Sequence, residues 1–170
     1  MRDQTQVVVT GLAWMGSGVG SIESALERIF READSEILIT SYAISNAADL
    51  VLEWLENALA RGVLVRMIIN RIHDQPGEVV ARLENAYLNY PHFYLYSFAD
   101  DQGYDLHAKI VVADRRLALV GSSNISKRGL LNNHELALFV EGKSAEQIAS
   151  TVDKLLTNPS VTQTNREQTA

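Results

Sequence analysis

The segment HAKIVVADRRLALVGSSN, which begins at residue 107, carries residue types that act on phosphate groups at close and regular spacing. His107 and Lys109 are two residues apart on an expected strand, and side chains two apart on a strand project from the same face. Ala108, between them, is expected to pack inward. An imidazole supplies a nucleophile and an ammonium stabilises the charge of a phosphoryl group, so this pair predicts phosphoryl chemistry.

The rest of the segment is expected to fold back onto this pair. Residues 108–113 are expected to form one strand, with an apolar stretch at 110–113, and after a short turn residues 117–120 form the next. Strands joined by a tight turn are antiparallel, so Ser122 and Asn124 arrive at the end where His107 lies. A hydroxyl and an amide then join the imidazole and the ammonium, and the set offers several hydrogen-bond donors to a phosphate.

The complete pattern is HxK, D and GSxN, made by His107, Lys109, Asp114, Gly121, Ser122 and Asn124. It resembles the signature of the phospholipase D superfamily, and the spacing matches without a gap. The resemblance implies a two-step phosphodiester reaction that needs no metal and no other cofactor. His107 would attack phosphorus to form a phosphohistidine, while Lys109, Ser122 and Asn124 would bind the phosphate.

Three further roles are implied by the same resemblance. Glu135 stands where single-motif members carry a glutamate that accepts a hydrogen bond from the catalytic histidine. It would fix the tautomer of His107 and stabilise its cationic form. Asp114 and Gly121 are expected to be structural, with Asp114 ordering its turn or pairing with a neighbouring arginine rather than contacting substrate.

The chain contains one such motif, whereas the implied reaction uses two. None of the other histidines, His73, His92 and His134, is followed two residues later by a lysine. A two-fold homodimer with the active site on its axis is the simplest solution, because each subunit then contributes one His107. One histidine would act as nucleophile, while the other protonates the leaving oxygen and later activates water.

The charge of the chain narrows the choice of substrate. With 15 basic and 21 acidic residues the net charge is −6, which argues against a protein that coats nucleic acid non-specifically but not against a local basic site. The leading hypothesis is a metal-independent nuclease, similar to short bacterial nucleases and to defence-associated phospholipase D-like proteins. Two alternatives remain: a lipid phosphodiesterase, although no basic amphipathic helix favours it, and a non-catalytic subunit of an anti-phage defence complex.

The sequence also bears on where the protein acts. No stretch approaches the ~20 apolar residues that a membrane span needs, and the N-terminal apolar run is too short and interrupted for a secretory signal. A cytoplasmic protein without a transmembrane segment is therefore expected. The absence of cysteine excludes disulfides and thiolate metal sites.

Apolar runs alternate with amphipathic segments over residues 1–157, which predicts a single domain built as an α/β/α sandwich around a mixed sheet. Strands are expected at 7–10, 36–44, 63–70, 93–97, 108–113, 117–120 and 135–140, and helices at 22–33, 47–60, 76–89 and 145–156. Ser21 is the expected N-cap of the first helix, and Gly62 the residue that ends the second. Residues 158–170 have little to bury and are expected to form a disordered tail.

A few polar residues near the motif have two interpretations. Tyr42 follows an expected strand and either lines the site or packs in the core. His73 and Asp74 lie in a loop at the end of a strand and are expected to stay outside the site, with entry into the pocket as the alternative. Lys127 and Arg128 are expected to be solvated surface residues, with contact to a nucleic-acid backbone as the alternative.

Overall fold

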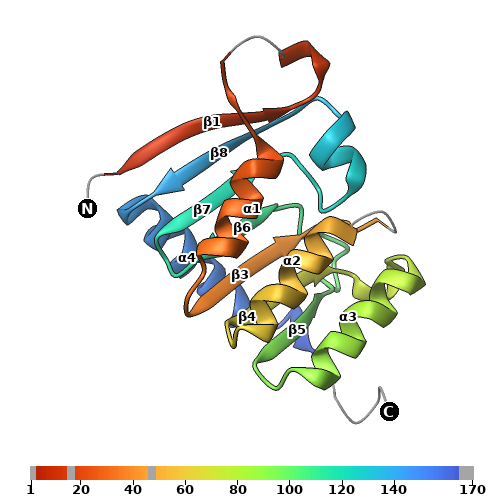
Figure 1. The fold of residues 1–170 in the computed structure, drawn as a ribbon. Coiled ribbons are helices and arrows are strands. Elements are labelled where there is room, and N and C mark those ends of the chain that lie inside the picture. The colour runs from red at the N-terminus through yellow and green to blue at the C-terminus, as the bar shows by residue number, and fades with distance from the viewer. Residues whose placement is uncertain (1–2, 15–17, 46–48, 165–170) are drawn as a thin grey trace.

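One mixed sheet runs through the protein (Figure 1). The computed structural model describes residues 3–14, 18–45 and 49–164, and over these residues nine strands follow the order β2-β1-β8-β7-β6-β3-β4-β5-β9. β3, β4 and β5 are parallel, whereas β6, β7 and β8 are each antiparallel to their neighbours. The strands are β1 Gln4–Thr10, β2 Gly20–Ser21, β3 Glu36–Ser41, β4 Leu64–Asn70, β5 Phe93–Phe98, β6 Ile110–Ala113, β7 Leu117–Gly121, β8 Glu135–Glu141 and β9 Val161–Gln163.

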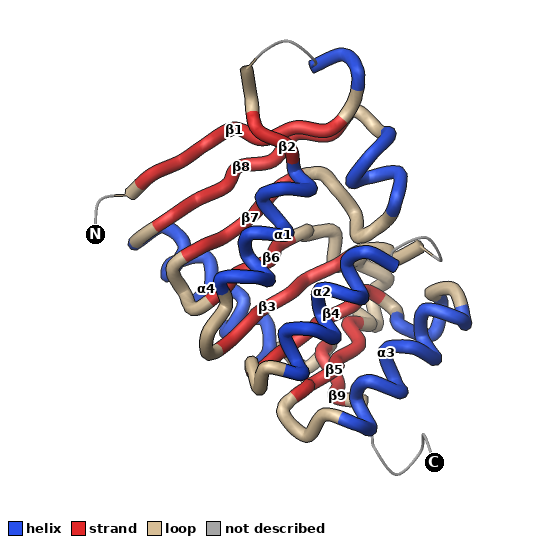
Figure 2. Tube along the Cα trace, in the orientation of Figure 1, coloured by secondary structure: helices blue, strands red, loops and turns tan. Residues whose placement is uncertain are grey.

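Helices cover both faces of this sheet, as Figures 1 and 2 show. Three of them, α1 Ile22–Glu32, α2 Asp49–Ala60 and α3 Gly77–Asn89, lie on one face, and α4 Lys143–Leu156 lies on the other. The predicted α/β/α sandwich with a mixed sheet is therefore confirmed. No helix in the described part of the chain is long and apolar enough to cross a membrane.

The helix boundaries follow from local chemistry that the sequence displays. Ser21 caps α1, because its hydroxyl oxygen accepts a hydrogen bond from the Ser24 amide at 3.0 Å. Gly62 follows α2 with a φ of 87°, a left-handed conformation that glycine adopts without strain. Both predictions are confirmed. The expected first residue of the second helix, Ala47, lies outside the described residues.

Two apolar clusters hold the layers together. The larger lies between the sheet and the helices α1, α2 and α3, and buries Phe30, Leu55 and Tyr87 among many others. The smaller lies under α4, where Ala145, Ala149 and Val152 pack on the other face of the sheet. Because the central strands are buried on both faces, they carry continuous apolar runs rather than alternating ones.

The C-terminal segment departs from the sequence-based expectation. Val161–Gln163 forms β9, which pairs antiparallel with β5, and the Tyr87 hydroxyl donates a 2.6 Å hydrogen bond to the carbonyl of Thr164. The predicted disordered tail is thus wrong for residues 158–164. Val161 packs against the smaller apolar cluster, and the open edge of β5 supplies backbone partners that the tail's own composition does not reveal. Residues 165–170 lie outside the described part.

The topology brings distant segments to one end of the sheet. β3 ends at Ser41, and its antiparallel neighbour β6 begins there, with Ile110 opposite Thr40. β7 returns antiparallel to β6 and ends at the same place, and β8 starts beside it, with Gly121 opposite Ala137. Side chains that follow β3, precede β6, follow β7 or start β8 therefore meet at this end.

Candidate active site

His107 and Lys109 lie together at this end of the sheet, as predicted. The Lys109 Nζ is 3.1 Å from the Nδ1 of His107 and donates a 2.8 Å hydrogen bond to the His107 carbonyl. The backbone differs from the prediction, however, because β6 begins at Ile110 and both residues precede it. Ala108 is exposed rather than packed inward, and its carbonyl accepts a hydrogen bond from the Thr40 hydroxyl at 3.0 Å.

Tyr42 completes this cluster from the end of β3. Its ring centroid lies 4.6 Å from that of His107, with the planes inclined at 51°. The Lys109 Nζ lies 5.4 Å from the same tyrosine ring, within the range of a cation–π contact. Of the two interpretations of Tyr42, the structure supports the one in which it lines the site.

Lys109 is the most deeply placed charge of the site, with only 9% of the residue exposed. Burial lowers the pKa of its ammonium below the usual value, and the negative charge of Glu135 offsets part of that effect. A buried ammonium has lost much of its hydration and therefore interacts strongly with an anion that reaches it. Lys109 is suited to hold a phosphate.

Asn124 lies on the same side of the sheet as Lys109, and both line a small cavity. The Asn124 side chain has a buried Oδ1 atom without a hydrogen-bond partner in the described part of the chain. A buried polar atom left unpaired costs about 1–3 kcal/mol. Such a cost is typical of functional sites. The Oδ1 atom is an acceptor, so the group of this side chain that can donate to a phosphate oxygen is its Nδ2 amide.

Glu135 does not make the predicted contact. Its Oε2 accepts a short hydrogen bond from the Ser122 hydroxyl, and its Oε1 accepts one from the Asn133 side chain at 3.2 Å. Among the described residues no hydrogen bond joins Glu135 to His107, so the predicted orienting contact is corrected to a Ser122–Glu135 pair. Ser122 directly follows β7, which pairs with β8, and Glu135 begins β8. The Ser122 hydroxyl is therefore close enough to bond the Glu135 carboxylate.

Asp114 has a structural role. Its carboxylate accepts hydrogen bonds of 2.8–2.9 Å from the backbone amides of Asp34, Ser35 and Glu36, and one from the Ser35 hydroxyl. Burial would raise the pKa of this carboxyl, but these hydrogen bonds together lower it to about 2. The Arg116 guanidinium also lies 3.5 Å away. Asp114 thereby ties the turn after β6 to the start of β3.

Gly121 has a structural role as well. A Cβ atom there would lie against the Ala137 side chain, 2.7 Å from the Ala137 Cα and 2.8 Å from the Leu136 carbonyl oxygen. Only glycine lets β7 and β8 approach this closely. The close approach in turn sets the positions of Ser122 and Glu135.

A second network, which sequence reasoning missed, fixes the backbone around the cluster. The buried Asn70, at the end of β4, accepts a 2.8 Å hydrogen bond from the Leu106 amide and donates one to Asp105. Gln75 accepts from the Ile44 amide and donates to the Tyr42 carbonyl at 3.2 Å. A signal was available for Asn70, because a polar residue that ends an apolar parallel strand lies where sites form.

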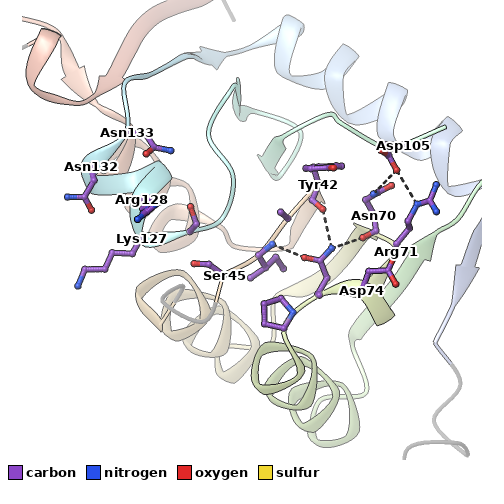
Figure 3. A pocket seen from close by; sticks show the side chains of 15 residues that line it. Tyr42, Ser45, Asn70, Arg71, Asp74, Asp105, Lys127, Arg128, Asn132 and Asn133 are labelled. Carbon is purple, nitrogen blue, oxygen red and sulfur yellow. Dashed lines mark hydrogen bonds and ion pairs between the residues drawn. The ribbon is translucent and has the colours of Figure 1, made fainter. Parts of the chain in front are cut away.

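A groove of about 1090 Å³ opens beside Tyr42. Figure 3 shows its two walls, with Lys127, Arg128, Asn132 and Asn133 on one side and Asn70, Arg71 and Asp74 on the other. Asp74 thus reaches the pocket, contrary to expectation, while His73 does not line it. Lys127 and Arg128 are exposed, as predicted, yet they face this groove. Within the described residues no cluster of three or more histidine or acidic side chains could hold a metal ion.

Comparison with known proteins agrees with this arrangement. A family model described as "Cardiolipin synthase, PLD-like domain" matches residues 26–157. The DISARM protein DrmC of Bacillus paralicheniformis is 33% identical over 138 residues, which are 79% of this chain and 56% of that protein. The chain therefore spans little more than half the length of this relative.

Solved structures show the same fold. Nuc from Salmonella typhimurium, a phospholipase D family member, superposes with a TM-score of 0.75 at 19% identity, over 96% of this chain and 99% of that one. NucT from Helicobacter pylori gives 0.72 at 18% identity, over 96% and 100%. Phosphatidylserine synthase from Haemophilus influenzae gives 0.70 at 14% identity, over 95% and 40%.

Proposed function

Because the chain belongs to the family of phospholipase D-like domains, we propose that it is a metal-independent phosphodiesterase, and specifically a nuclease that acts through a phosphohistidine in a homodimeric active site. The observation that carries this proposal is the contact between Lys109 and the ring of His107. This contact places the cation that would bind the phosphate directly beside the imidazole that would attack it.

The proposed reaction uses two copies of this cluster. A ring nitrogen of His107 attacks phosphorus, a nitrogen–phosphorus bond forms, and the bond to the leaving oxygen breaks as the partner's His107 gives that oxygen a proton. The partner's His107 then takes a proton from water, whose oxygen attacks phosphorus and breaks the nitrogen–phosphorus bond. Lys109 and Asn124 hold the non-bridging oxygens throughout.

Each residue's place in this scheme rests on its surroundings. Tyr42 supports the His107 ring through a tilted ring contact and restricts its rotation. Glu135 places negative charge near Lys109 and so favours the charged ammonium. Ser122 is engaged by Glu135, and in the proposed scheme it donates to phosphate only when substrate displaces that carboxylate.

An exposed apolar surface adjoins the half-site and supports a second copy of the chain as partner. Val7, Leu136 and Leu138 are 46%, 45% and 40% exposed. Val7 is opposite Leu138 in register, and both share a face with Val140, which α4 covers. This surface begins next to Glu135 and therefore adjoins the proposed half-site.

Replacing Leu138 by arginine is expected to convert the dimer to monomers and to lower cleavage at least tenfold, because a charge would then be buried in the interface. Light scattering after size exclusion gives the mass, and a cleavage assay gives the activity. Leu88→Arg, an equally exposed leucine on α3, is the control and should stay dimeric. A Leu138→Arg protein that remains a fully active dimer contradicts the assignment of this surface.

The proposal is tested by incubating the wild-type chain, in EDTA, with labelled single- and double-stranded DNA, RNA and phosphatidyl lipid. Cleavage of a nucleic acid is expected without any added metal, because the site holds its phosphate with Lys109 and Asn124. A strict requirement for a divalent ion would overturn the mechanism. Cleavage of lipid alone would replace the nuclease by a lipid phosphodiesterase, and a dimer inert on all substrates would favour an assembly subunit.

The relative named DISARM protein DrmC supports a place for this chain in an anti-phage defence system. The match covers 56% of that relative, and the phospholipase D-like family model covers residues 26–157 of this chain. We therefore propose that the chain supplies, to a cytoplasmic defence complex, the domain that hydrolyses phosphodiesters.

A further inference from the structure

The groove beside Tyr42 is large relative to the chemistry that it adjoins. Its volume of about 1090 Å³ slightly exceeds the usual range of about 300–1,000 Å³ for small-molecule sites. A single phosphodiester occupies only the cluster of His107, Lys109 and Asn124. The groove is lined by Tyr42, which contacts His107, and by none of these three residues, so it fits the part of a substrate that continues beyond the bond to be cleaved.

One wall of this groove carries two cations, Lys127 and Arg128. Elsewhere in the described part of the chain, each arginine bonds a carboxylate or a backbone carbonyl, as Arg61 does with Phe30. Arg128 makes no such bond within the described residues, and the exposed Lys127 precedes it. In a chain of net charge −6, a pair of cations that bond no carboxylate among the described residues can bind an external anion.

These cations are held at a fixed offset from the catalytic motif. They begin the short helix Arg128–Asn132, which starts four residues after Asn124. A Cβ at Gly129 would lie 2.6 Å from the Asn124 carbonyl oxygen and 2.7 Å from the Ser123 hydroxyl, so the helix packs tightly on the motif. The Gly129 amide also donates to the Ser126 hydroxyl at 2.9 Å. Their spacing from the reacting phosphate is therefore built into the fold.

The opposite wall carries an exposed negative charge. Asp74 exposes a carboxylate to the groove, and Arg71 on the same wall is paired with Asp105 at 3.1 Å. Phosphates are repelled from Asp74, whereas the amino groups of nucleobases can donate hydrogen bonds to it. The two walls thus distinguish a backbone side from a base side.

We propose that this groove binds one strand of nucleic acid next to the scissile phosphate, with its flanking phosphates on Lys127 and Arg128 and its bases toward Asp74. Bases that turn toward Asp74 are not paired with a second strand, so the proposed substrate is single-stranded here. The inference rests on the proposed nuclease function and adds the strand type and the residues that select a polymer over a small phosphodiester.

The test compares the double variant Lys127→Ala/Arg128→Ala with the wild type, each carrying His107→Ala so that binding is measured without cleavage. The probe is a labelled single strand of 20 nucleotides, and its binding is measured by fluorescence anisotropy over a range of salt concentrations. The dissociation constant should rise at least tenfold in the double variant. The slope of log Kd against log salt should fall by about 1.4, because each lost phosphate contact contributes about 0.7.

Arg31→Ala/Lys154→Ala is the charge-matched control, since both residues are exposed and neither lines the groove. Equal slopes for the double variant and this control would overturn the inference. In the active background, the ratio of kcat/KM for the strand to that for a small aryl phosphodiester should fall tenfold or more. A wild type that hydrolyses neither substrate contradicts the proposed function. The salt dependence of binding then still shows whether the groove binds a nucleic-acid strand.

Discussion

Replacing His107 by alanine is expected to reduce cleavage by about 10⁴-fold or more, because the substitution removes both the nucleophile and the acid that protonates the leaving oxygen. Thermal unfolding should change little, since the side chain is exposed and its contacts are to Tyr42 and Lys109. Activity is measured with the labelled strand in EDTA. His73→Ala, an exposed histidine outside the groove, is the matched control and should keep full activity.

The same variant tests whether the two subunits share one site. When equal amounts of wild type and His107→Ala are unfolded together and refolded, half of the dimers are mixed. If the site needs both histidines, only the pure wild-type dimers are active. The mixture then has about a quarter of the activity of the same total amount of wild-type protein. Independent sites would leave about half. That outcome would remove the shared site while leaving His107 catalytic.

The second large effect concerns Asp114, for which alanine is expected to lower the free energy of unfolding by about 2–4 kcal/mol. The substitution leaves the amides of Asp34, Ser35 and Glu36 without their acceptor. It also places alanine at a φ of 51°, a left-handed conformation that aspartate and asparagine tolerate better. Urea denaturation followed by circular dichroism measures the change.

Asparagine at position 114 isolates the charge from the shape. The folded-state pKa of about 2 lies below the ordinary value of 3.8, so the charged carboxylate contributes about 2 kcal/mol of stability above pH 4. This contribution is lost as the pH falls through the folded-state pKa. The difference in unfolding free energy between wild type and Asp114→Asn should therefore shrink as the pH is lowered from about 5 toward 2.

Asp34→Asn is the control for this series, because its side chain is 91% exposed, and it should change stability by less than about 0.5 kcal/mol. A cost for Asp114→Asn that stays constant over the whole pH range would contradict the charge-based account. It would assign the role of Asp114 to shape alone.

The sequence predicted the grouping of the proposed site residues because their spacing is short. His107 and Lys109 are two residues apart, and Ser122 and Asn124 return after one tight turn, so local geometry brings them together. The layered fold was equally accessible, since apolar runs and amphipathic helices alternate along the chain. These features depend on residues that are close together in the sequence, so they can be predicted from one sequence.

What the sequence did not reveal depends on distant segments. Asn70 binds the Leu106 amide 36 residues away, and Tyr42 meets His107 only because β3 and β6 are neighbours in the sheet. The hydrogen bond of Glu135 could not be assigned, because the resemblance named His107 while the nearer Ser122 competed for the same carboxylate. Such contacts depend on which strands become neighbours in the sheet, and the spacing of a motif does not specify this.

The pairing of β9 with β5 has a consequence for anyone who shortens this chain. The family match ends at residue 157, before Val161–Gln163. A chain cut there would leave the outer backbone amides and carbonyls of β5 without partners over Tyr96–Phe98. An unprotected strand of this kind recruits strands from other molecules, so the shortened protein would tend to self-associate and precipitate for reasons unrelated to its chemistry.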